Sequence, residues 1–159
     1  MSEPTIPVLP AHSVVYVVDD DEAVRDSLRW LLESNGFTAV AFDSAESFLR
    51  TTHGGAPRDQ AACLILDVRM PGMSGLELHE ELLRRDIHIP LIFITGHGDV
   101  PMAVSSMKRG AVDFLEKPFN DAHLCSIVRD CLARSAAQQR DNEAERQAQE
   151  RKRPIRDVY

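Results

Sequence analysis

The sequence has few cysteines and no long apolar run. Its three cysteines, Cys63, Cys125 and Cys131, are odd in number and do not stand in close pairs, which argues against a disulfide framework and against a zinc site. We expect buried thiols instead. The longest apolar runs, such as residues 61–66, have about a third of the length that a membrane-spanning helix needs. The sequence therefore predicts that the chain does not enter a membrane.

The first ten residues lack the features of a secretion signal. They contain three prolines and Glu3, but no Lys or Arg and no apolar block, whereas a signal peptide has a basic region followed by an apolar one. We therefore expect a cytoplasmic protein in which residues 1–11 form a disordered leader.

Size and charge indicate one acidic globular domain with an appendage. The chain has 159 residues, of which 43% are hydrophobic and 27% charged, and one domain takes roughly 150 residues. Residues 1–133 carry 20 acidic and 11 basic side chains, a net charge of −9, while residues 134–159 carry 5 and 7, a net charge of +2. Because so acidic a body repels phosphate backbones, we expect no direct contact between this domain and nucleic acid.

Strand-like and helix-like segments alternate five times along the chain. Residues 14–18 form a β-branched run apolar enough for a strand covered on both faces, and apolar residues recur at helical spacing over 22–35. The other pairs are expected at 38–42 and 44–52, 63–66 and 75–85, 91–94 and 100–109, and 112–115 and from 120 onward. This order predicts an α/β fold, (βα)₅, with a doubly wound parallel sheet of the flavodoxin-like or CheY-like type and strand order 2-1-3-4-5.

The last helix is expected to extend beyond the core. Residues 120–153 contain neither Pro nor Gly, and as one helix they would reach about 51 Å. Apolar spacing typical of a packed helix ends near Arg134, so we predict a folded domain over residues 12–134 and a helical linker or tail over 135–159. Two interpretations of the tail stay open: a solvated, partly frayed linker, or a spacer or weak coiled coil.

Acidic residues follow the first and third predicted strands. Asp19, Asp20 and Asp21 come after the first strand, and Asp67 comes after the third. These strands are neighbours in such a sheet, which binds ligands at the carboxyl ends of its strands. Converging carboxylates repel one another, and a hard divalent cation, best Mg²⁺, is the usual reason to tolerate them. The alternative for Asp20, Asp21 and Glu22 is a helix N-cap with acids on the helix dipole.

Two further polar residues follow the fourth and fifth predicted strands. They are Thr95 and Lys117. A carboxylate nucleophile, Mg²⁺, one cation and one hydroxyl donor are the set that phosphoryl transfer to a carboxylate requires, because charge on the phosphoryl oxygens must be neutralised from several sides. Taken singly, Thr95 is typical of a turn and Lys117 of an exposed lysine, so it is their joint placement that favours this chemistry.

Four stretches resemble the receiver domain of two-component response regulators. They are residues 17–20, 66–75, 94–99 and 114–119, and the resemblance covers roughly residues 12–134. Residues 95–104 are more narrowly similar to the FixJ subgroup, in which a LuxR-type helix-turn-helix domain follows a linker. The resemblance implies a signalling switch rather than an enzyme. Its partner would be a sensor histidine kinase, and it would control transcription through a DNA-binding domain that is absent from this chain.

The resemblance also implies roles for the acidic residues and the lysine. Asp67 would be the phospho-acceptor. Asp20 would bind Mg²⁺ directly, together with Asp67 and the backbone carbonyl of Arg69, while Asp19 would act through a metal-bound water. Lys117 would pair with Asp67 or with a phosphoryl oxygen, and the peptide bond that follows Lys117 would be cis.

Four more positions take their roles from the same resemblance. Thr95 would bond the phosphoryl group, and Phe114 would move with it as an aromatic switch residue. An aromatic residue in a strand is more often part of the core, so that alternative stays open for Phe114. Arg69 and His97 stand where the family tunes the lifetime of the phosphate, although a histidine between two glycines is usually just exposed.

Phosphorylation is expected to cause dimerisation through a face built from residues 100–109, residues 112–115 and the start of the last helix.

Two alternatives to this function remain. A stand-alone receiver would relay phosphate or dock a partner. A phosphatase of the haloacid dehalogenase type would need a second aspartate two residues after the nucleophile, where this chain has Arg69, a residue that cannot donate a proton near neutral pH.

Overall fold

The computed structural model describes residues 12–52, 60–96 and 99–152. These residues form a single parallel sheet with the strand order β2-β1-β3-β4-β5. Its strands are β1 (Ser13–Val18), β2 (Ala39–Phe42), β3 (Ala61–Asp67), β4 (Leu91–Thr95) and β5 (Asp113–Glu116). The predicted α/β fold and strand order are confirmed. β3 lies between β1 and β4 and is buried along its whole length.

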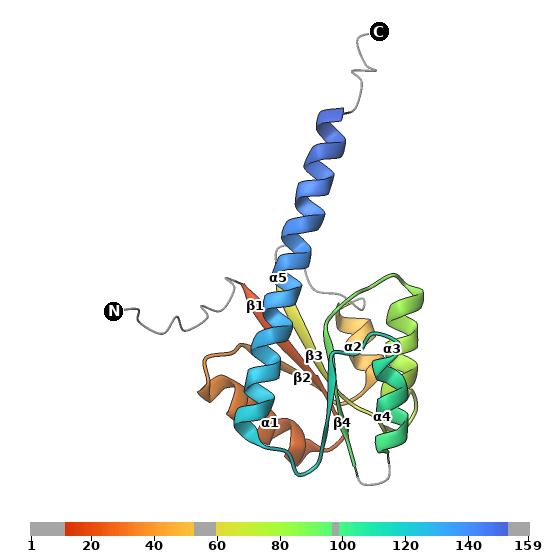
Figure 1. Cartoon of the computed structure of the whole chain (residues 1–159). Helices are drawn as coiled ribbons and strands as arrows, with labels where there is room; N and C mark the ends of the chain where they lie inside the picture. Colours follow the sequence, from red (N-terminus) through yellow and green to blue (C-terminus); the bar gives the residue numbers. More distant parts are fainter. Residues whose placement is uncertain (1–11, 53–59, 97–98, 153–159) are drawn as a thin grey trace, which may run out of the picture.

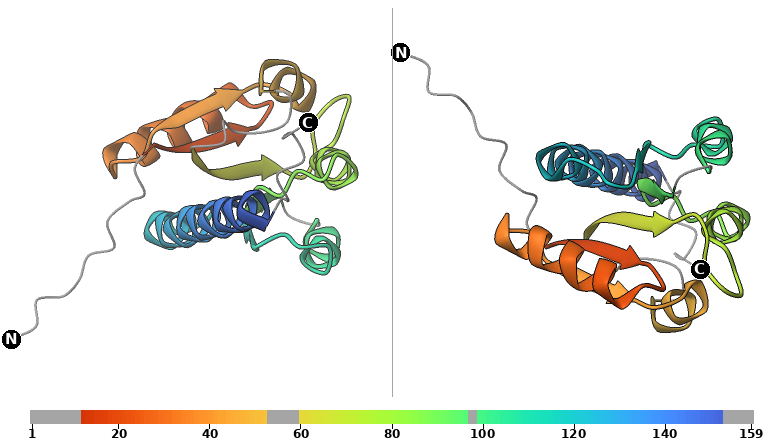
Figure 2. Two further views of the ribbon diagram at one scale, coloured as in Figure 1. Left: turned by 90° about the horizontal axis from the view of Figure 1, so that it is seen from above. Right: turned by 90° about the horizontal axis from the view of Figure 1, so that it is seen from below.

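Helices cover both faces of the sheet, as predicted. In the described part of the chain they are α1 (Glu22–Ser34), α2 (Ala45–Thr52), α3 (Gly75–Arg84), α4 (Val100–Met107) and α5 (Asp121–Lys152). Seen along the sheet, α1 and α5 lie on one side, and α2, α3 and α4 lie on the other (Figure 2). The elements keep close to their predicted limits, with one difference that affects the site: Asp67 and Thr95 are the last residues of β3 and β4 rather than the first residues beyond them.

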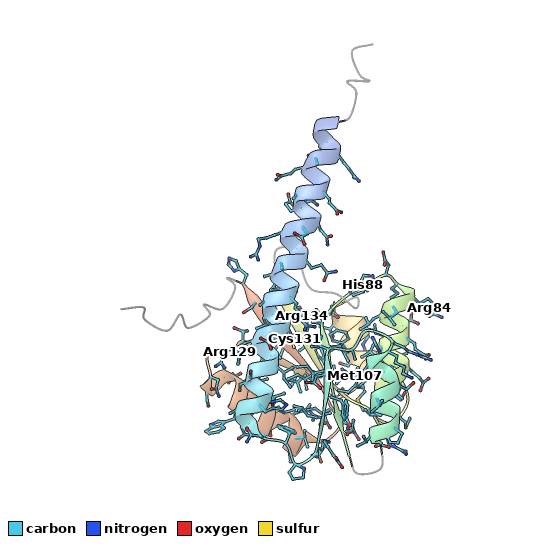
Figure 3. The ribbon with its side chains drawn as sticks, viewed as in Figure 1. Arg84, His88, Met107, Arg129, Cys131 and Arg134 are labelled. Atoms are coloured by element: carbon cyan, nitrogen blue, oxygen red, sulfur yellow. The ribbon has the colours of Figure 1, made fainter. Side chains whose placement is uncertain are left out.

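Side chains that alternate along the buried strands form two apolar layers. Val15 and Val17 of β1 pack with α1 and α5, whereas Tyr16 packs with α2 and α3 on the opposite face. The three cysteines are free and buried, as predicted. At the rim of the first layer, the guanidinium of Arg129 lies over the ring of Phe37, 5.4 Å from the ring centroid. Figure 3 labels Arg129 on α5.

α5 continues past the sheet as one helix and projects from the domain (Figure 1). Packing does not end at Arg134, since Ser135 is buried and Gln139 is half-buried, whereas residues 140–150 are exposed. Within the described residues, no helix combines the length and the apolar character needed to span a membrane. The predictions for the leader, residues 1–11, and for the end of the tail, residues 153–159, lie outside the described residues.

Candidate functional site

Three of the predicted acidic residues meet at the carboxyl edge of the sheet. Asp67 ends β3, and Asp19 and Asp20 follow β1. Each offers a carboxylate oxygen, and these oxygens lie within 4.8 Å of one another. Asp19 is 1% exposed and Asp67 is 8% exposed, while Asp20 faces solvent. The cluster combines hard oxygen donors, two of them buried, with one open side, which is a donor set that suits a divalent cation.

Asp21 has a different role from its two neighbours. Its side chain caps α1 by accepting a hydrogen bond from the backbone N–H of Ala23 at 2.9 Å. Its own backbone N–H donates to Oδ1 of Asp19, also at 2.9 Å. The N-cap alternative is therefore correct for Asp21, and the cap holds the Asp19 carboxylate in place.

Lys117 brings a positive charge to the acidic cluster from the end of β5. Its Nζ lies 3.5 Å from Oδ2 of Asp19 and 3.9 Å from Oδ2 of Asp67. Its backbone N–H donates to the carbonyl of Thr95 at 2.9 Å, and its bond to Pro118 is cis, as the resemblance implied. One ammonium facing three carboxylates leaves these four described groups with a net negative charge.

Burial and like charge raise the pKa values of the two buried acids. The pKa of Asp67 is raised from 3.8 to about 6, first because the carboxylate is buried and then because Asp19 is charged, and Lys117 only partly opposes this. Burial also raises the pKa of Asp19, against the hydrogen bond from the Asp21 N–H. The charged form of each carboxylate is thus disfavoured in the folded chain, and a bound cation would reduce that cost.

A close backbone contact fixes the loop that follows Asp67. A Cβ on Gly75 would lie 2.0 Å from the backbone carbonyl oxygen of Asp67, so only glycine fits there. The N–H of Gly75 donates to the carbonyl of Val68 at 3.0 Å. Ser74 and Glu77 form a reciprocal capping box at the start of α3. Asp67 therefore lies between a buried strand and a capped helix.

Thr95 presents an unpaired hydroxyl inside the sheet edge. It is fully buried, and among the described residues its Oγ1 is the buried side-chain atom without a hydrogen-bond partner. Such a group is costly to bury, which indicates a site shaped for a ligand or for a second conformation. Phe114 on the neighbouring strand pairs in register with Phe93 and is half-buried against the α2–α3–α4 layer, so it is packed but not enclosed.

Arg69 connects the two loops beside Asp67. Its backbone N–H lies 3.4 Å from Oδ1 of Asp67, and its Nε donates to Oδ1 of Asp99 at 2.6 Å. Asp99 is a buried carboxylate directly before α4. Sequence reasoning did not single out Asp99, whose only signal was its place before a predicted helix. His97 lies outside the described residues.

Comparisons with known proteins agree with this geometry. The family described as response regulator receiver domain matches residues 15–129. The transcriptional regulatory protein FixJ of Azorhizobium caulinodans is 52% identical over 136 residues, which are 86% of this chain and 63% of that protein. The solved response regulator StyR has a TM-score of 0.80 at 44% identity, covering 88% of this chain and 69% of that one. Full-length FixJ from B. japonicum has a TM-score of 0.70 at 45% identity, covering 77% and 58%.

Proposed function

This chain belongs to the response regulator receiver domain family, which works in phosphorylation-based signalling with sensor kinases, and we propose that Asp67 accepts a phosphoryl group from a sensor histidine kinase. The observation that carries the proposal is the position of Asp67. It ends the central strand, shares a site with Asp19 and Asp20 within 4.8 Å, and lies 3.9 Å from the Lys117 ammonium. Asp19 has the same neighbours, but it lies beyond the end of β1, a strand nearer the edge of the sheet, and its Oδ1 already accepts the N–H of Asp21 at 2.9 Å.

Asp19, Asp20 and Asp67 would hold Mg²⁺ together with the backbone carbonyl of Arg69, with Asp19 acting through water. Their oxygens fit a hard divalent cation. The pKa of Asp67 is raised first by burial and then by the charge of Asp19, and a bound cation would offset both effects. When bound, Mg²⁺ neutralises charge on the acceptor and on the phosphoryl oxygens. Lys117 supplies a further positive charge from the protein itself.

The reaction at Asp67 is a displacement at phosphorus. A carboxylate oxygen of Asp67 forms a bond to phosphorus while the bond from phosphorus to the imidazole nitrogen of the donor breaks. Lys117 then pairs with a phosphoryl oxygen, and the Thr95 hydroxyl, which has no bond to give up, donates to another. Arg69 and His97 modulate how long the phosphoryl group stays.

Movement of Thr95 links the site to an output face. As Thr95 turns toward the phosphoryl group, Phe114 fills the vacated space, and the face built from α4, β5 and the start of α5 changes shape. Val104 of α4 is an exposed hydrophobic residue, at 45%, which supports a role for α4 in a dimer interface.

The output we propose is control of transcription by the FixJ-type arrangement. The chain spans 63% of the length of the FixJ of Azorhizobium caulinodans, a protein named as a transcriptional regulator. Here residues 12–134 act as the receiver and residues 135–159 lead to a DNA-binding domain of the LuxR type. The acidic receiver itself does not touch nucleic acid, and the protein works in the cytoplasm, where it reaches DNA.

Intact-mass spectrometry after incubation with acetyl phosphate and Mg²⁺ tests the acceptor. We expect one phosphoryl adduct that a chelator prevents and that Asp67→Ala abolishes. Asp43→Ala is the matched control, because Asp43 is an exposed aspartate that follows β2 at the same sheet edge. An adduct that persists in Asp67→Ala would overturn the assignment. No adduct on the wild-type chain would favour a partner-docking receiver instead.

A further inference from the structure

The N-terminal end of β3 extends beyond its neighbour β4. The pairing of these strands begins with Leu64 opposite Leu91, and the N–H groups of Leu64 and Val68 donate to carbonyls on the β4 side. Because N–H groups two residues apart point the same way in a strand, the N–H of Ala62 also points toward the β4 side. No β4 residue pairs with it.

Side chains of α5 take the place of the missing strand. Oγ of Ser135 accepts the hydrogen bond of the Ala62 N–H at 2.9 Å, and Nε2 of Gln139 donates to the carbonyl of Gln60. Ala62 is 2% exposed and Ser135 is 8% exposed, so water has little access to the first bond. Figure 3 shows Cys131 and Arg134 on the part of α5 that passes the sheet, just before Ser135.

The spacing of the two bonds suits a helix lying along a strand. Ser135 and Gln139 are four residues apart and therefore lie on one helix face, separated by a rise of ~6 Å. Gln60 and Ala62 are two residues apart in extended chain and span ~6.6 Å. The rise of one helical turn is thus close to the length of two strand residues, so Ser135 and Gln139 can bond the Ala62 N–H and the Gln60 carbonyl at the same time.

We propose that Ser135 and Gln139 form a clamp that completes the hydrogen bonding of β3 and makes the arm of α5, residues 140–152, a rigid extension of the domain. The arm needs such an anchor, because residues 140–150 are exposed and an isolated helix of this length is marginal in water. The clamp holds one helical turn in place, and the helix of the arm can continue from that turn without a new nucleation step. The direction of the arm is thereby set by β3, the strand whose other end carries Asp67. This inference is independent of the phosphorylation chemistry.

Amide hydrogen exchange of the full chain tests the first bond. In Ser135→Ala we expect the ratio of the Ala62 to the Leu64 exchange rate to rise about tenfold or more, since only the Ala62 N–H loses its acceptor. Leu64 in the same strand reports global opening, so a general loss of stability does not change the ratio. Ser126→Ala, at an exposed serine of α5, should leave the ratio unchanged. An unchanged ratio in Ser135→Ala would overturn the clamp.

Distance measurements between two spin labels test whether the arm is rigid. The labels replace exposed side chains, so that labelling itself removes no buried contact. Labels on Asp26→Cys of α1 and Gln149→Cys of the arm occupy exposed positions, and the native cysteines are buried. We expect a narrow distance distribution in the parent chain, a clearly broader one after Gln139→Ala, and no change after Gln138→Ala, whose side chain is exposed. A broad distribution in the parent chain, or an equally narrow one in Gln139→Ala, would refute a rigid clamped arm.

Discussion

Replacing Asp67 with Asn should stabilise the protein in the absence of metal. Asn keeps the shape of the side chain but removes its charge, and the Asp67 side chain is only 11% exposed. The pKa of Asp67 is raised from 3.8 to about 6, and one pKa unit corresponds to ~1.36 kcal/mol. The ionised carboxylate thus costs the folded protein about 3 kcal/mol at pH 7.5, and Asp67→Asn should raise the free energy of unfolding by about that amount.

The stabilisation should depend on pH in a defined direction. The pKa of Asp67 is higher in the folded than in the unfolded chain, so the folded state binds the proton more tightly. The cost of the charge is therefore complete above the folded pKa and disappears once the pH falls below the unfolded value. The difference between Asp67→Asn and wild type should shrink from about 3 kcal/mol at pH 7.5 to about 0.5 kcal/mol near pH 4 and to almost nothing near pH 3.

Urea unfolding followed by circular dichroism, with a chelator present, measures this difference. A gain of about 3 kcal/mol corresponds to roughly 6–12 °C in Tm for a domain of this size. Asp43→Asn, at an exposed aspartate of the same edge, should change little. Added Mg²⁺ should stabilise wild type more than Asp67→Asn, because the variant has lost a ligand. An unchanged or lower stability of metal-free Asp67→Asn, or a gap that widens on acidification, would refute the electrostatic reasoning.

Three further predictions concern the surroundings of Asp67 and the proposed output. Thr95→Val should raise the free energy of unfolding by about 1 kcal/mol, because it removes a buried unpaired hydroxyl, while weakening the binding of beryllofluoride; a loss of stability in urea unfolding would contradict this. Gly75→Ala should lower the free energy of unfolding by about 3 kcal/mol or more in the same assay, because the new Cβ would lie 2.0 Å from the Asp67 carbonyl oxygen. Gly96→Ala is the control, because a Cβ there makes only an ordinary contact at 3.9 Å. Beryllofluoride with Mg²⁺ should double the mass of the wild-type chain in light scattering but not that of Asp67→Ala, and an unchanged wild-type mass would count against dimerisation as output.

Local sequence patterns were sufficient to predict the fold and the position of the acidic cluster. Alternating apolar segments define strands and helices by short-range periodicity, and the parallel order places every strand end at one edge. Asp19, Asp20 and Asp67 were therefore expected together before any distance was known, and the structure brings them within 4.8 Å. Their roles in phosphoryl transfer, and those of Lys117 and Thr95, remain predictions for the experiments above.

Tertiary structure alone decided the features that depend on burial and on contacts between distant segments. The pKa of Asp67 follows from its enclosure beside Asp19, and Asp99 became part of the site only because the fold brings Arg69 to it across two loops. The packed part of α5 also extends beyond Arg134, where the apolar spacing ends, since Ser135 accepts a hydrogen bond from a strand residue 73 positions earlier in the chain. Periodicity reports which face of an element is apolar, but it carries no information on which distant backbone group lacks a partner. That pairing is settled only when the elements pack.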